Sequence, residues 1–322
     1  MSDEFGRIPR YRELPIDSSK PAGSSWGVFG DEDQTGTVNL LTEERVRNAA
    51  GLVRKGAVFS LNWDLQKPGP AILSRGDLKH SILKFAEGTD DHYDNFYTQA
   101  SSQWDALCHI QHPEHGFYNG VTFDDITGEP GSRNGIDNWA KRGIAGRFVL
   151  ADVARFFAKQ GQPLKADEAR AITVDDVDAV LASEGVQLQD GDILLLRFGW
   201  ISWYENTDAS TRSRLAQPPY YFPNPGLAQD ERMAEWIWDH RLAAVAGDNP
   251  GLEVYPVDPS RVDGMLHYRI IPLLGLAVGE MFALDALAGD CEADGIYEGL
   301  FTAAPLNKVG GSGSPANALA LK

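Results

Sequence analysis

The stretch Thr173-Val-Asp-Asp-Val-Asp-Ala-Val-Leu-Ala-Ser-Glu-Gly185, followed by Asp192-Ile-Leu-Leu-Leu-Arg-Phe198, indicates the class of fold. The first part predicts a helix, because Thr173 and Asp176 can form a capping box, apolar residues recur at helical spacing and Gly185 ends the pattern. The second part is a nearly continuous apolar run of strand length, which is typical of a strand buried on both faces. A helix that leads into a buried strand predicts an α/β fold.

Further helices and strands are predicted on both sides of this pair. A helix begins at Thr42, where Glu43 and Glu44 favour its positive end, and Gly56 closes it. The remaining predicted elements are a helix over 229–240 and strands over 57–63, 147–153, 242–247 and 276–280. Because no linker or internal repeat separates these elements, the sequence predicts a single domain over 26–322, preceded by an N-terminal arm over 1–25.

Composition and charge exclude several classes of protein. The chain has 322 residues with 46 acidic and 29 basic side chains, for a net charge of −17. Such a chain lacks the clustered Lys and Arg of a phosphate-binding surface, so no nucleic-acid partner is expected. No run approaches the roughly 18 apolar residues that span a bilayer, so no membrane partner is expected. Two cysteines cannot form a disulfide framework and residues 1–12 do not resemble a signal peptide, which predicts a cytoplasmic protein.

Five of the seven histidines lie between His80 and His115, which directs the search for chemistry to this region. Within it, residues 99–106 alternate in polarity. If this segment is extended, one face carries Gln99, Ser101, Gln103 and Asp105, and the other carries Ser102, Trp104 and Ala106. Such a polar face can hold an ion or a polar substrate, and it is also typical of the solvent-exposed side of a half-buried strand. The pattern alone leaves both interpretations open.

Two further residues are candidates for acid–base chemistry. His109 follows Asp105 by four residues, and a carboxylate beside an imidazole can orient it and raise its basicity. The alternative is a histidine that backbone groups satisfy. Glu280 interrupts an apolar stretch over 273–284, and burial raises the pKa of a carboxylate towards that of a useful acid or base. The alternative there is a buried glutamate paired with an arginine.

A zinc site on other residues is a third hypothesis. Suitable ligand types are present at Cys108, His109, His112 and His115. Pro113 interrupts any helix through them, however, and their spacing matches no standard zinc site. The sequence therefore does not favour this cluster.

Several blocks of the sequence, taken in order, are typical of one known family. They are Trp26-Gly27, Asp33–Thr42, Gly146–Asp152, Asp190–Trp200, Ala246–Pro250, His267 and Gly279-Glu280. With these blocks the chain resembles the cyclase family that includes kynurenine formamidase and isatin hydrolase, and more closely its longer bacterial branch, named "putative cyclase". The resemblance implies an α/β fold of the swivelling β/β/α type and a homodimer or homotetramer. It also implies that the last residues, Gly313-Ser-Pro315 and Ala318–Leu321, are paired in a sheet.

The chain departs from the metal-binding motif of this family. The hallmark is His-x-Gly-Thr-His-x-Asp-x-Pro-x-His, in which the first two His and the Asp bind a divalent metal. Asp105 aligns with the Asp and His109 with the last His, but Gln99 and Gln103 replace the two metal-binding His. Glutamine carbonyls are poor zinc ligands and suit harder ions such as Mn²⁺ or Mg²⁺. The resemblance therefore implies a weak or absent metal, with Mn, Mg or Zn as candidates, on these two glutamines and Asp105.

The resemblance also implies an activity, the hydrolysis of a cyclic or aryl amide or of a lactone. His109, oriented by Asp105, would take a proton from water. His267 and Glu280 match the later His and Glu that complete the site, and they would supply protons or stabilise the oxyanion. Aromatic residues near these blocks suggest a neutral, ring-bearing small-molecule substrate, with Phe96, Tyr97, Trp104 and Tyr118 as substrate-binding candidates.

Two other classes of function stay open, because the two glutamines weaken the argument for a metal. One is a metal-free lyase or cyclising enzyme that uses the same pocket. The other is a small-molecule-binding relative without catalysis.

Overall fold

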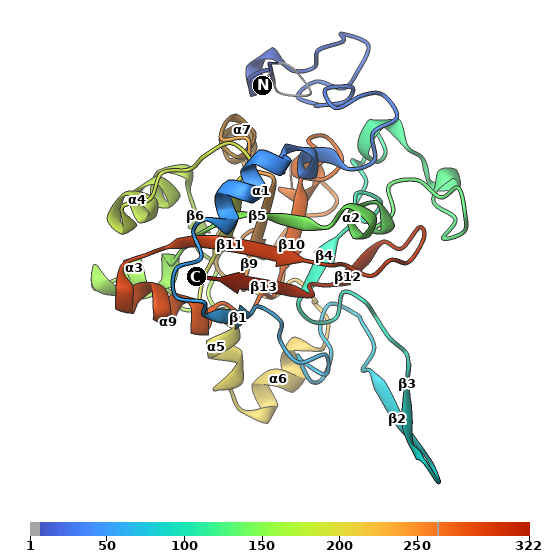
Figure 1. The fold of residues 1–322 in the computed structure, drawn as a ribbon, viewed down its shortest axis with the longest axis vertical. Helices are drawn as coiled ribbons and strands as arrows, with labels where there is room; N and C mark the ends of the chain where they lie inside the picture. Colours follow the sequence, from blue (N-terminus) through green and yellow to red (C-terminus); the bar gives the residue numbers. More distant parts are fainter. Residues whose placement is uncertain (1–6, 263) are drawn as a thin grey trace.

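The computed structural model describes residues 7–262 and 264–322, and its centre is a nine-stranded mixed sheet (Figure 1). Across the sheet the strands follow the order β1 (Val58–Ser60), β13 (Ala318–Leu321), β11 (Glu298–Ala303), β5 (Ile144–Ala151), β7 (Ile193–Leu196), β9 (Ala244–Gly247), β10 (Ala277–Glu280), β4 (Gln103–Asp105) and β12 (Gly313–Pro315). The neighbours from β5 to β10 are parallel, and all other neighbours are antiparallel. This sheet confirms the predicted α/β class.

Helices surround the sheet and are joined to it by short connections (Figure 1). They are α1 (Glu43–Ala50), α2 (Asp137–Arg142), α3 (Val153–Lys159), α4 (Val174–Glu184), α5 (Trp200–Glu205), α6 (Ala209–Leu215), α7 (Glu231–Asp239), α8 (His267–Ile270) and α9 (Asp285–Asp294). Helix α1 packs on β5 and β11, and α4 packs on β5 and α3. A separate two-stranded sheet, formed by β6 (Ala171–Ile172) and β8 (Gly226–Leu227), lies outside the main sheet. Within the described ranges no helix is both long and apolar enough to cross a membrane.

The helix and strand predicted over 173–198 are both confirmed. The Thr173 hydroxyl oxygen accepts a hydrogen bond from the Asp176 N–H at the start of α4, and Gly185 ends the helix with a left-handed φ of 70°. Every residue of β7 is buried, as its continuous apolar pattern predicts. This local agreement arises because the caps and the apolar pattern favour the same structure as the tertiary packing.

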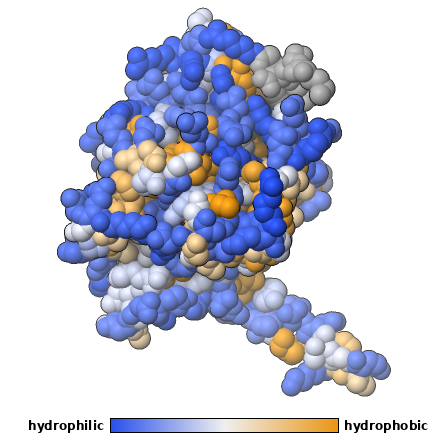
Figure 2. All heavy atoms as spheres, turned by 60° about the vertical axis from the view of Figure 1, so that its left-hand side comes forward, coloured by the Kyte–Doolittle hydropathy of each residue, from blue (hydrophilic) through white to orange (hydrophobic). Residues whose placement is uncertain are grey.

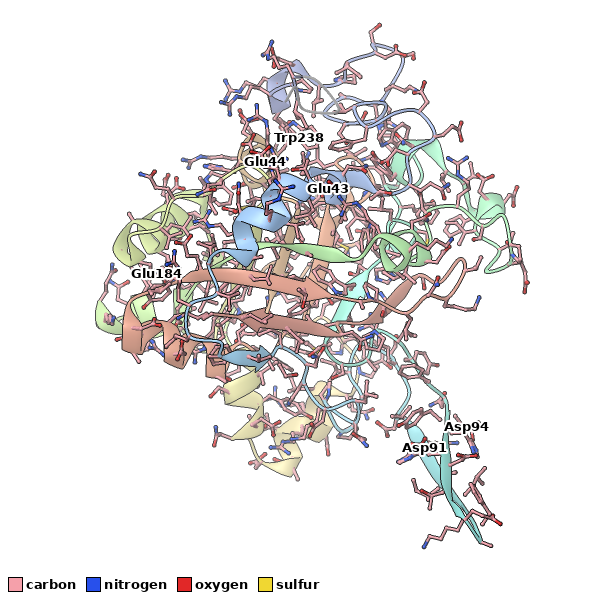
Figure 3. The ribbon with its side chains drawn as sticks, viewed as in Figure 1. Glu43, Glu44, Asp91, Asp94, Glu184 and Trp238 are labelled. Carbon is pink, nitrogen blue, oxygen red and sulfur yellow. The ribbon has the colours of Figure 1, made fainter. Side chains whose placement is uncertain are left out.

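The helix predicted over 42–56 is shorter than the sequence indicates. Glu43 lies in the first turn of α1 (Figure 3), but the helix ends at Ala50. The backbone N–H groups of Lys55 and Ala57 instead donate to the carbonyl oxygen of Lys322. Hydrogen bonds to the C-terminal residue thus replace the last helical turn of the prediction.

The C-terminal residues are paired as predicted. Strand β13 lies between β1 and β11, and β12 pairs with β4. Residues 313–321 therefore supply β12 at one edge of the sheet and β13, the strand next to the other edge.

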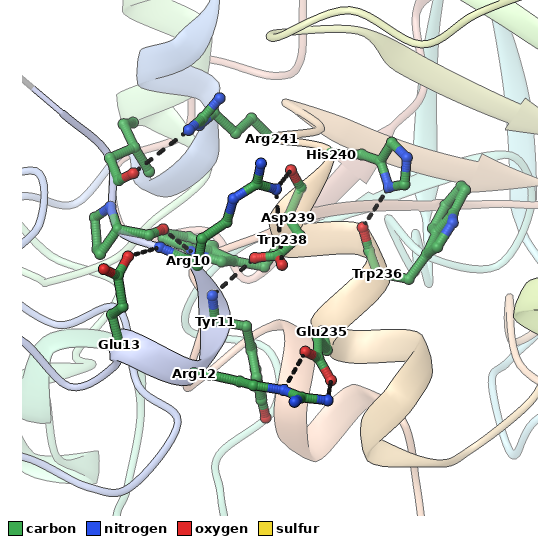
Figure 4. A network of polar contacts seen from close by, with 12 residues as sticks. Arg10, Tyr11, Arg12, Glu13, Glu235, Trp236, Trp238, Asp239, His240 and Arg241 are labelled. Carbon is green, nitrogen blue, oxygen red and sulfur yellow. Dashed lines mark hydrogen bonds and ion pairs between the residues drawn. The ribbon is translucent and has the colours of Figure 1, made fainter.

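The N-terminal arm packs against the molecule through the short helix η1 (Tyr11–Glu13), which contacts α7 (Figure 4). The Tyr11 N–H donates to Asp239 at 2.8 Å, and the Arg12 guanidinium pairs with Glu235 at 2.7 Å. The predicted boundary between arm and domain at residue 25 stays a prediction.

A hairpin that the sequence analysis did not predict stands off the body of the molecule (Figures 1 and 2). Its strands β2 (Lys79–Phe85) and β3 (Gly88–Asp94) are exposed along their whole length. The acidic side chains of Asp91 and Asp94 lie on β3 (Figure 3), and Ile82 is half exposed on β2. Because neither face is buried, the hairpin has no apolar alternation that would reveal it in the sequence.

Candidate functional site

The register of β4 determines which side chains enter the site. Strand alternation places Gln103 and Asp105 on one face of β4 and Trp104 on the other, as predicted. Antiparallel pairing with β10 sets Gln103 opposite Glu280, and pairing with β12 sets Asp105 opposite Gly313. All three residues of β4 are buried. The polar face therefore points into the protein, and the alternative of a solvent-exposed face is wrong.

The other face of β4 belongs to the hydrophobic core. Trp104 is fully buried and makes edge-to-face contacts with Trp139, Phe282 and Phe301 at centroid distances of 6.4, 5.2 and 6.0 Å. Its indole N–H donates to the Ala316 carbonyl oxygen at 3.0 Å. Because its ring has no accessible surface, Trp104 is corrected from a substrate-binding residue to a packing residue.

This packing leads to a prediction about stability. Trp104→Ala is expected to lower the free energy of unfolding by about 3–5 kcal/mol, because the change leaves a cavity among three aromatic rings. Urea denaturation measures it, with Ile82→Ala on the exposed hairpin as the control, expected within about 0.5 kcal/mol of the unmodified protein. A loss below about 1 kcal/mol for Trp104→Ala would contradict the observed packing.

A buried cluster forms where β4, β10 and α8 meet. It consists of Asp105 on β4, Glu280 on β10 and His267 at the start of α8. One ligand-type atom from each lies within 4.8 Å of the other two. The His267 Nε2 atom is 3.2 Å from Glu280 Oε1 and 3.7 Å from Asp105 Oδ2. The structure thus brings together three of the four predicted catalytic residues, although the roles assigned to them stay predictions.

A fourth buried group, Glu253, orients His267. Its carboxylate accepts a hydrogen bond from His267 Nδ1 at 2.5 Å and another from the Leu266 N–H at the start of α8. With Nδ1 held in this way, Nε2 points towards Asp105 and Glu280. Sequence reasoning missed Glu253, because it stands 14 residues before its partner and in no recognisable motif.

The two glutamines bind the carboxylates of the cluster through their amide nitrogens. Gln99 Nε2 donates to Asp105 Oδ1 at 2.5 Å, and Gln103 Nε2 donates to Glu280 Oε2 at 2.6 Å. Two buried oxygens, Gln103 Oε1 and Asp105 Oδ2, have no hydrogen-bond partner among the described residues. A buried oxygen without a donor is costly, so both atoms are suited to face a cation or a bound water.

His109 lies beside this cluster with its imidazole partly accessible. Its Nε2 is 3.7 Å from Asp105 Oδ1, and its side chain is 24% exposed, against 1% for Asp105. Burial lowers the pKa of His109 more than the nearby Asp105 charge raises it. The imidazole is therefore neutral near pH 7 and able to accept a proton.

The acidic groups of the cluster differ in protonation. Burial alone would raise the pKa of Asp105, but His109 and His267, both protonated at the acidic pH where Asp105 titrates, lower it to about 2. Burial and the charge of Asp105 raise the pKa of Glu280 to about 7. Burial would lower the pKa of His267, but its carboxylate partners, Glu253 first, hold it well above the ordinary value. Near neutral pH, Glu280 can therefore gain or release a proton, while Asp105 stays ionised.

The chemistry of these donors fits a divalent cation. Asp105 and Glu280 offer carboxylate oxygens, Gln103 offers an unpartnered amide oxygen, and His267 offers Nε2 once a cation displaces its proton. The Glu253–His267 contact is the carboxylate–histidine pair that commonly orients a metal ligand. Because oxygen donors predominate, the set suits Mn²⁺ or Mg²⁺ better than zinc. The donor set differs from the predicted one, since His267 and Glu280 accompany Asp105, whereas Gln99 turns its amide nitrogen to that residue.

The remaining candidates of the sequence analysis lie elsewhere. Tyr118 is fully buried and donates its hydroxyl to Asp33 at 3.0 Å, so its predicted contact with a substrate is also corrected to a packing role. Phe96 and Tyr97 are 37% and 46% exposed at the base of the hairpin, and their binding role stays a prediction. The proposed zinc ligands Cys108, His112 and His115 belong to no cluster of possible metal ligands among the described residues.

Comparison with known proteins places this chain in one family. The family model described as "Putative cyclase" matches residues 39–254. A solved structure described as a novel cyclase is 34% identical, with a TM-score of 0.81, and the match covers 93% of this chain and 99% of that one. No curated protein matches the sequence.

More distant solved structures share the fold. Isatin hydrolase A from Labrenzia aggregata is 16% identical, with a TM-score of 0.57, over 85% of this chain and 95% of its own. Isatin hydrolase A from Ralstonia solanacearum is 19% identical, with a TM-score of 0.58, over 87% of this chain and 97% of its own.

An α/β fold with a mixed sheet and a buried carboxylate–imidazole cluster defines the class of protein. Within this class, the chain belongs to the cyclase family. This finding confirms the resemblance and the fold class that the sequence analysis inferred.

Proposed function

We propose that the protein hydrolyses a cyclic or aryl amide, or a lactone, with His109 as the general base. The observation that carries this proposal is the position of Asp105, which lies 3.7 Å from both His109 Nε2 and His267 Nε2. One ionised carboxylate thus connects a neutral imidazole that can accept a proton with a group of donors that can hold a cation.

Each step of the proposed reaction transfers one proton and forms or breaks one bond. His109 Nε2 takes a proton from water as the water oxygen attacks the carbonyl carbon. Asp105 orients this imidazole and stabilises its charged form. The bond from the carbonyl carbon to nitrogen or oxygen then breaks, and the leaving atom receives the proton that His109 took from water. The products are a carboxylic acid and an amine or alcohol.

A divalent cation would be held by Asp105, His267, Glu280 and the amide oxygen of Gln103. When bound, it would supply Lewis-acid polarisation of the carbonyl group. Of the candidate ions, Mn²⁺ suits this mixture of oxygens and one imidazole best.

Two further observations support a neutral substrate and hydrolysis. The chain carries a net charge of −17 and the cluster contains several carboxylates, so an anionic substrate would be repelled. The solved structures that share the fold include two named isatin hydrolases, and this name supports hydrolysis as the class of reaction.

A panel of aryl amides and lactones tests the proposal, with metal analysis of the purified protein and assays with and without chelator. We expect hydrolysis of at least one class, and a decrease in kcat/KM of about 10²–10⁴-fold for His109→Ala, because one positioned general base contributes about this much. His240→Ala is the matched control, since His240 Nδ1 hydrogen bonds to the Trp236 carbonyl oxygen and His240 does not belong to the cluster of Asp105, His267 and Glu280. Near-full turnover by His109→Ala would rule out its role as the base.

The same panel separates the alternatives. Ring closure or elimination without hydrolysis would support a lyase or cyclising enzyme, and binding without turnover would support a non-catalytic relative. Assembly into a homodimer or homotetramer stays a prediction, which light scattering of the purified protein checks.

A further inference from the structure

Arg75 lies on a connection that packs between the two segments bearing the cluster. Leu73 packs against the hydrophobic cluster that contains Met281, next to Glu280, and against another that contains Met265, close before His267. Leu73 and Ser74 both adopt left-handed backbone conformations, with φ of 55° and 61°. Such conformations cost about 1–3 kcal/mol each outside glycine, so the packing of this segment, and not local preference, fixes the position of Arg75.

The guanidinium of Arg75 has an unused donor. Its Nη1 atom is buried and has no hydrogen-bond partner in the described parts of the chain. Nor does Arg75 form an ion pair within 4.0 Å with any carboxylate of those parts. A buried N–H of a charged group without an acceptor is costly, which indicates that a bound molecule supplies the acceptor.

The charge of Arg75 is directed at the cluster. Burial is the largest influence on the pKa values of Asp105, Glu280 and His109, and beside it the positive charge of Arg75 acts to lower all three. Arg75 has the same effect on buried Tyr255. Four groups from three segments of the chain therefore lie within the field of one guanidinium.

The hydrolysis proposed above produces a carboxylate, which is the kind of hydrogen-bond acceptor that Arg75 Nη1 lacks. Ring opening or amide cleavage converts a neutral carbonyl compound into a carboxylate. That product forms beside the carboxylates of Asp105, Glu253 and Glu280, which repel it. An arginine presents a planar fork of N–H donors that matches a carboxylate, and such charge-assisted hydrogen bonds are stronger than neutral ones.

We propose that Arg75 binds the carboxylate group of the acid that the reaction releases, and the developing negative charge that precedes it. This assignment rests on the proposed hydrolysis for its chemistry, and it predicts that the site takes aryl carboxylates as ligands. Arg75 then distinguishes the product acid from neutral compounds of the same shape.

Isothermal titration with benzoate and with neutral benzamide tests the assignment on the full chain, with equal metal content in every variant. Benzoate is expected to bind, and its Kd is expected to rise about 10- to 100-fold in Arg75→Gln, the range for loss of hydrogen bonds to a charged group. The affinity for benzamide is expected to change less than about twofold. Arg232→Gln is the control, because Arg232 forms an exposed pair with Asp175, and it should leave the Kd for benzoate unchanged.

Arg75→Lys covers the case in which the glutamine variant does not fold. Lysine keeps the charge but not the planar fork, so it is expected to bind benzoate with intermediate affinity. Absence of benzoate binding to the unmodified protein, or unchanged affinity in the Arg75 variants, would overturn the assignment even if the amide and lactone panel shows hydrolysis. Benzoate binding that depends on Arg75 in a protein that hydrolyses nothing would sustain Arg75 as a carboxylate-binding group, but it would reject the proposed hydrolysis and with it the role of Arg75 in binding a product.

Discussion

Replacing Asp105 by asparagine is expected to abolish cation binding and turnover together. Asp105 lies between the two sides of the site, with His109 and His267 each 3.7 Å from its oxygens. Its low pKa shows that the surroundings stabilise the ionised form. An amide in its place removes the charge and directs an N–H₂ group at one neighbour. We expect more than about 10²-fold weaker Mn²⁺ binding, beyond the effect of losing an outer partner, and no measurable hydrolysis.

Thermal denaturation with MnCl₂ and with EDTA measures the loss of Mn²⁺ binding. An ion that binds only the folded state stabilises that state by mass action and raises the Tm. Mn²⁺ is expected to raise the Tm of the unmodified protein but not that of Asp105→Asn. Asp192→Asn is the matched control: Asp192 is equally buried but pairs with Arg147 on another strand. That variant should lose stability and still respond to Mn²⁺. A normal response in Asp105→Asn would remove Asp105 from the cation site.

The second large effect is expected at Glu253, which acts on the site through His267. In Glu253→Gln the buried carboxylate that accepts from His267 Nδ1 and Leu266 N–H is lost. Removing one partner of a buried ion pair costs about 3 kcal/mol or more of the free energy of unfolding. The orientation of Nε2 is lost too, so Mn²⁺ affinity is expected to fall about 10- to 100-fold.

Urea denaturation and Mn²⁺ titration together measure the Glu253 variant, and Glu184→Gln is its control. Burial raises the pKa of Glu184 to about 8, so this side chain is already neutral at pH 7. Its carbonyl-type oxygen accepts from the Asp152 N–H, and glutamine can do the same. Glu184→Gln should therefore change neither stability nor Mn²⁺ affinity appreciably. Normal Mn²⁺ affinity in Glu253→Gln would show that Glu253 stabilises the fold but does not orient His267 for a cation.

The sequence correctly predicts those helices and strands whose signals lie within one short stretch of the chain. The α4 helix has its cap, its apolar face and its glycine within one short stretch, and β7 is a continuous apolar run. The alternation around Trp104 correctly predicts two faces of β4, but it does not say that the Trp104 face packs in the hydrophobic core. That distinction depends on Trp139, Phe282 and Phe301, which come from other parts of the chain.

The residues that the sequence analysis missed depend on tertiary contacts. Glu253 becomes significant only through the hydrogen bond to His267, and Arg75 only through a connection whose backbone is set by packing. Neither stands at a recognisable spacing from the motif around Asp105. The sequence therefore indicated the members of the cluster, Asp105, His267 and Glu280, but not Glu253 or Arg75 beside them.

The pairing of β4 with β12 also determines when the site can form during synthesis. Residues 313–315 support the strand that carries Gln103 and Asp105, yet the ribosome makes them long after β4. At translation rates of roughly 5–20 residues per second, β4 waits about 10–40 s for this neighbour. Until then one edge of β4 has no partner strand, and the nascent chain presents that edge for pairing with other chains. The site around Asp105 can therefore be completed only after residues 313–315 have been synthesised.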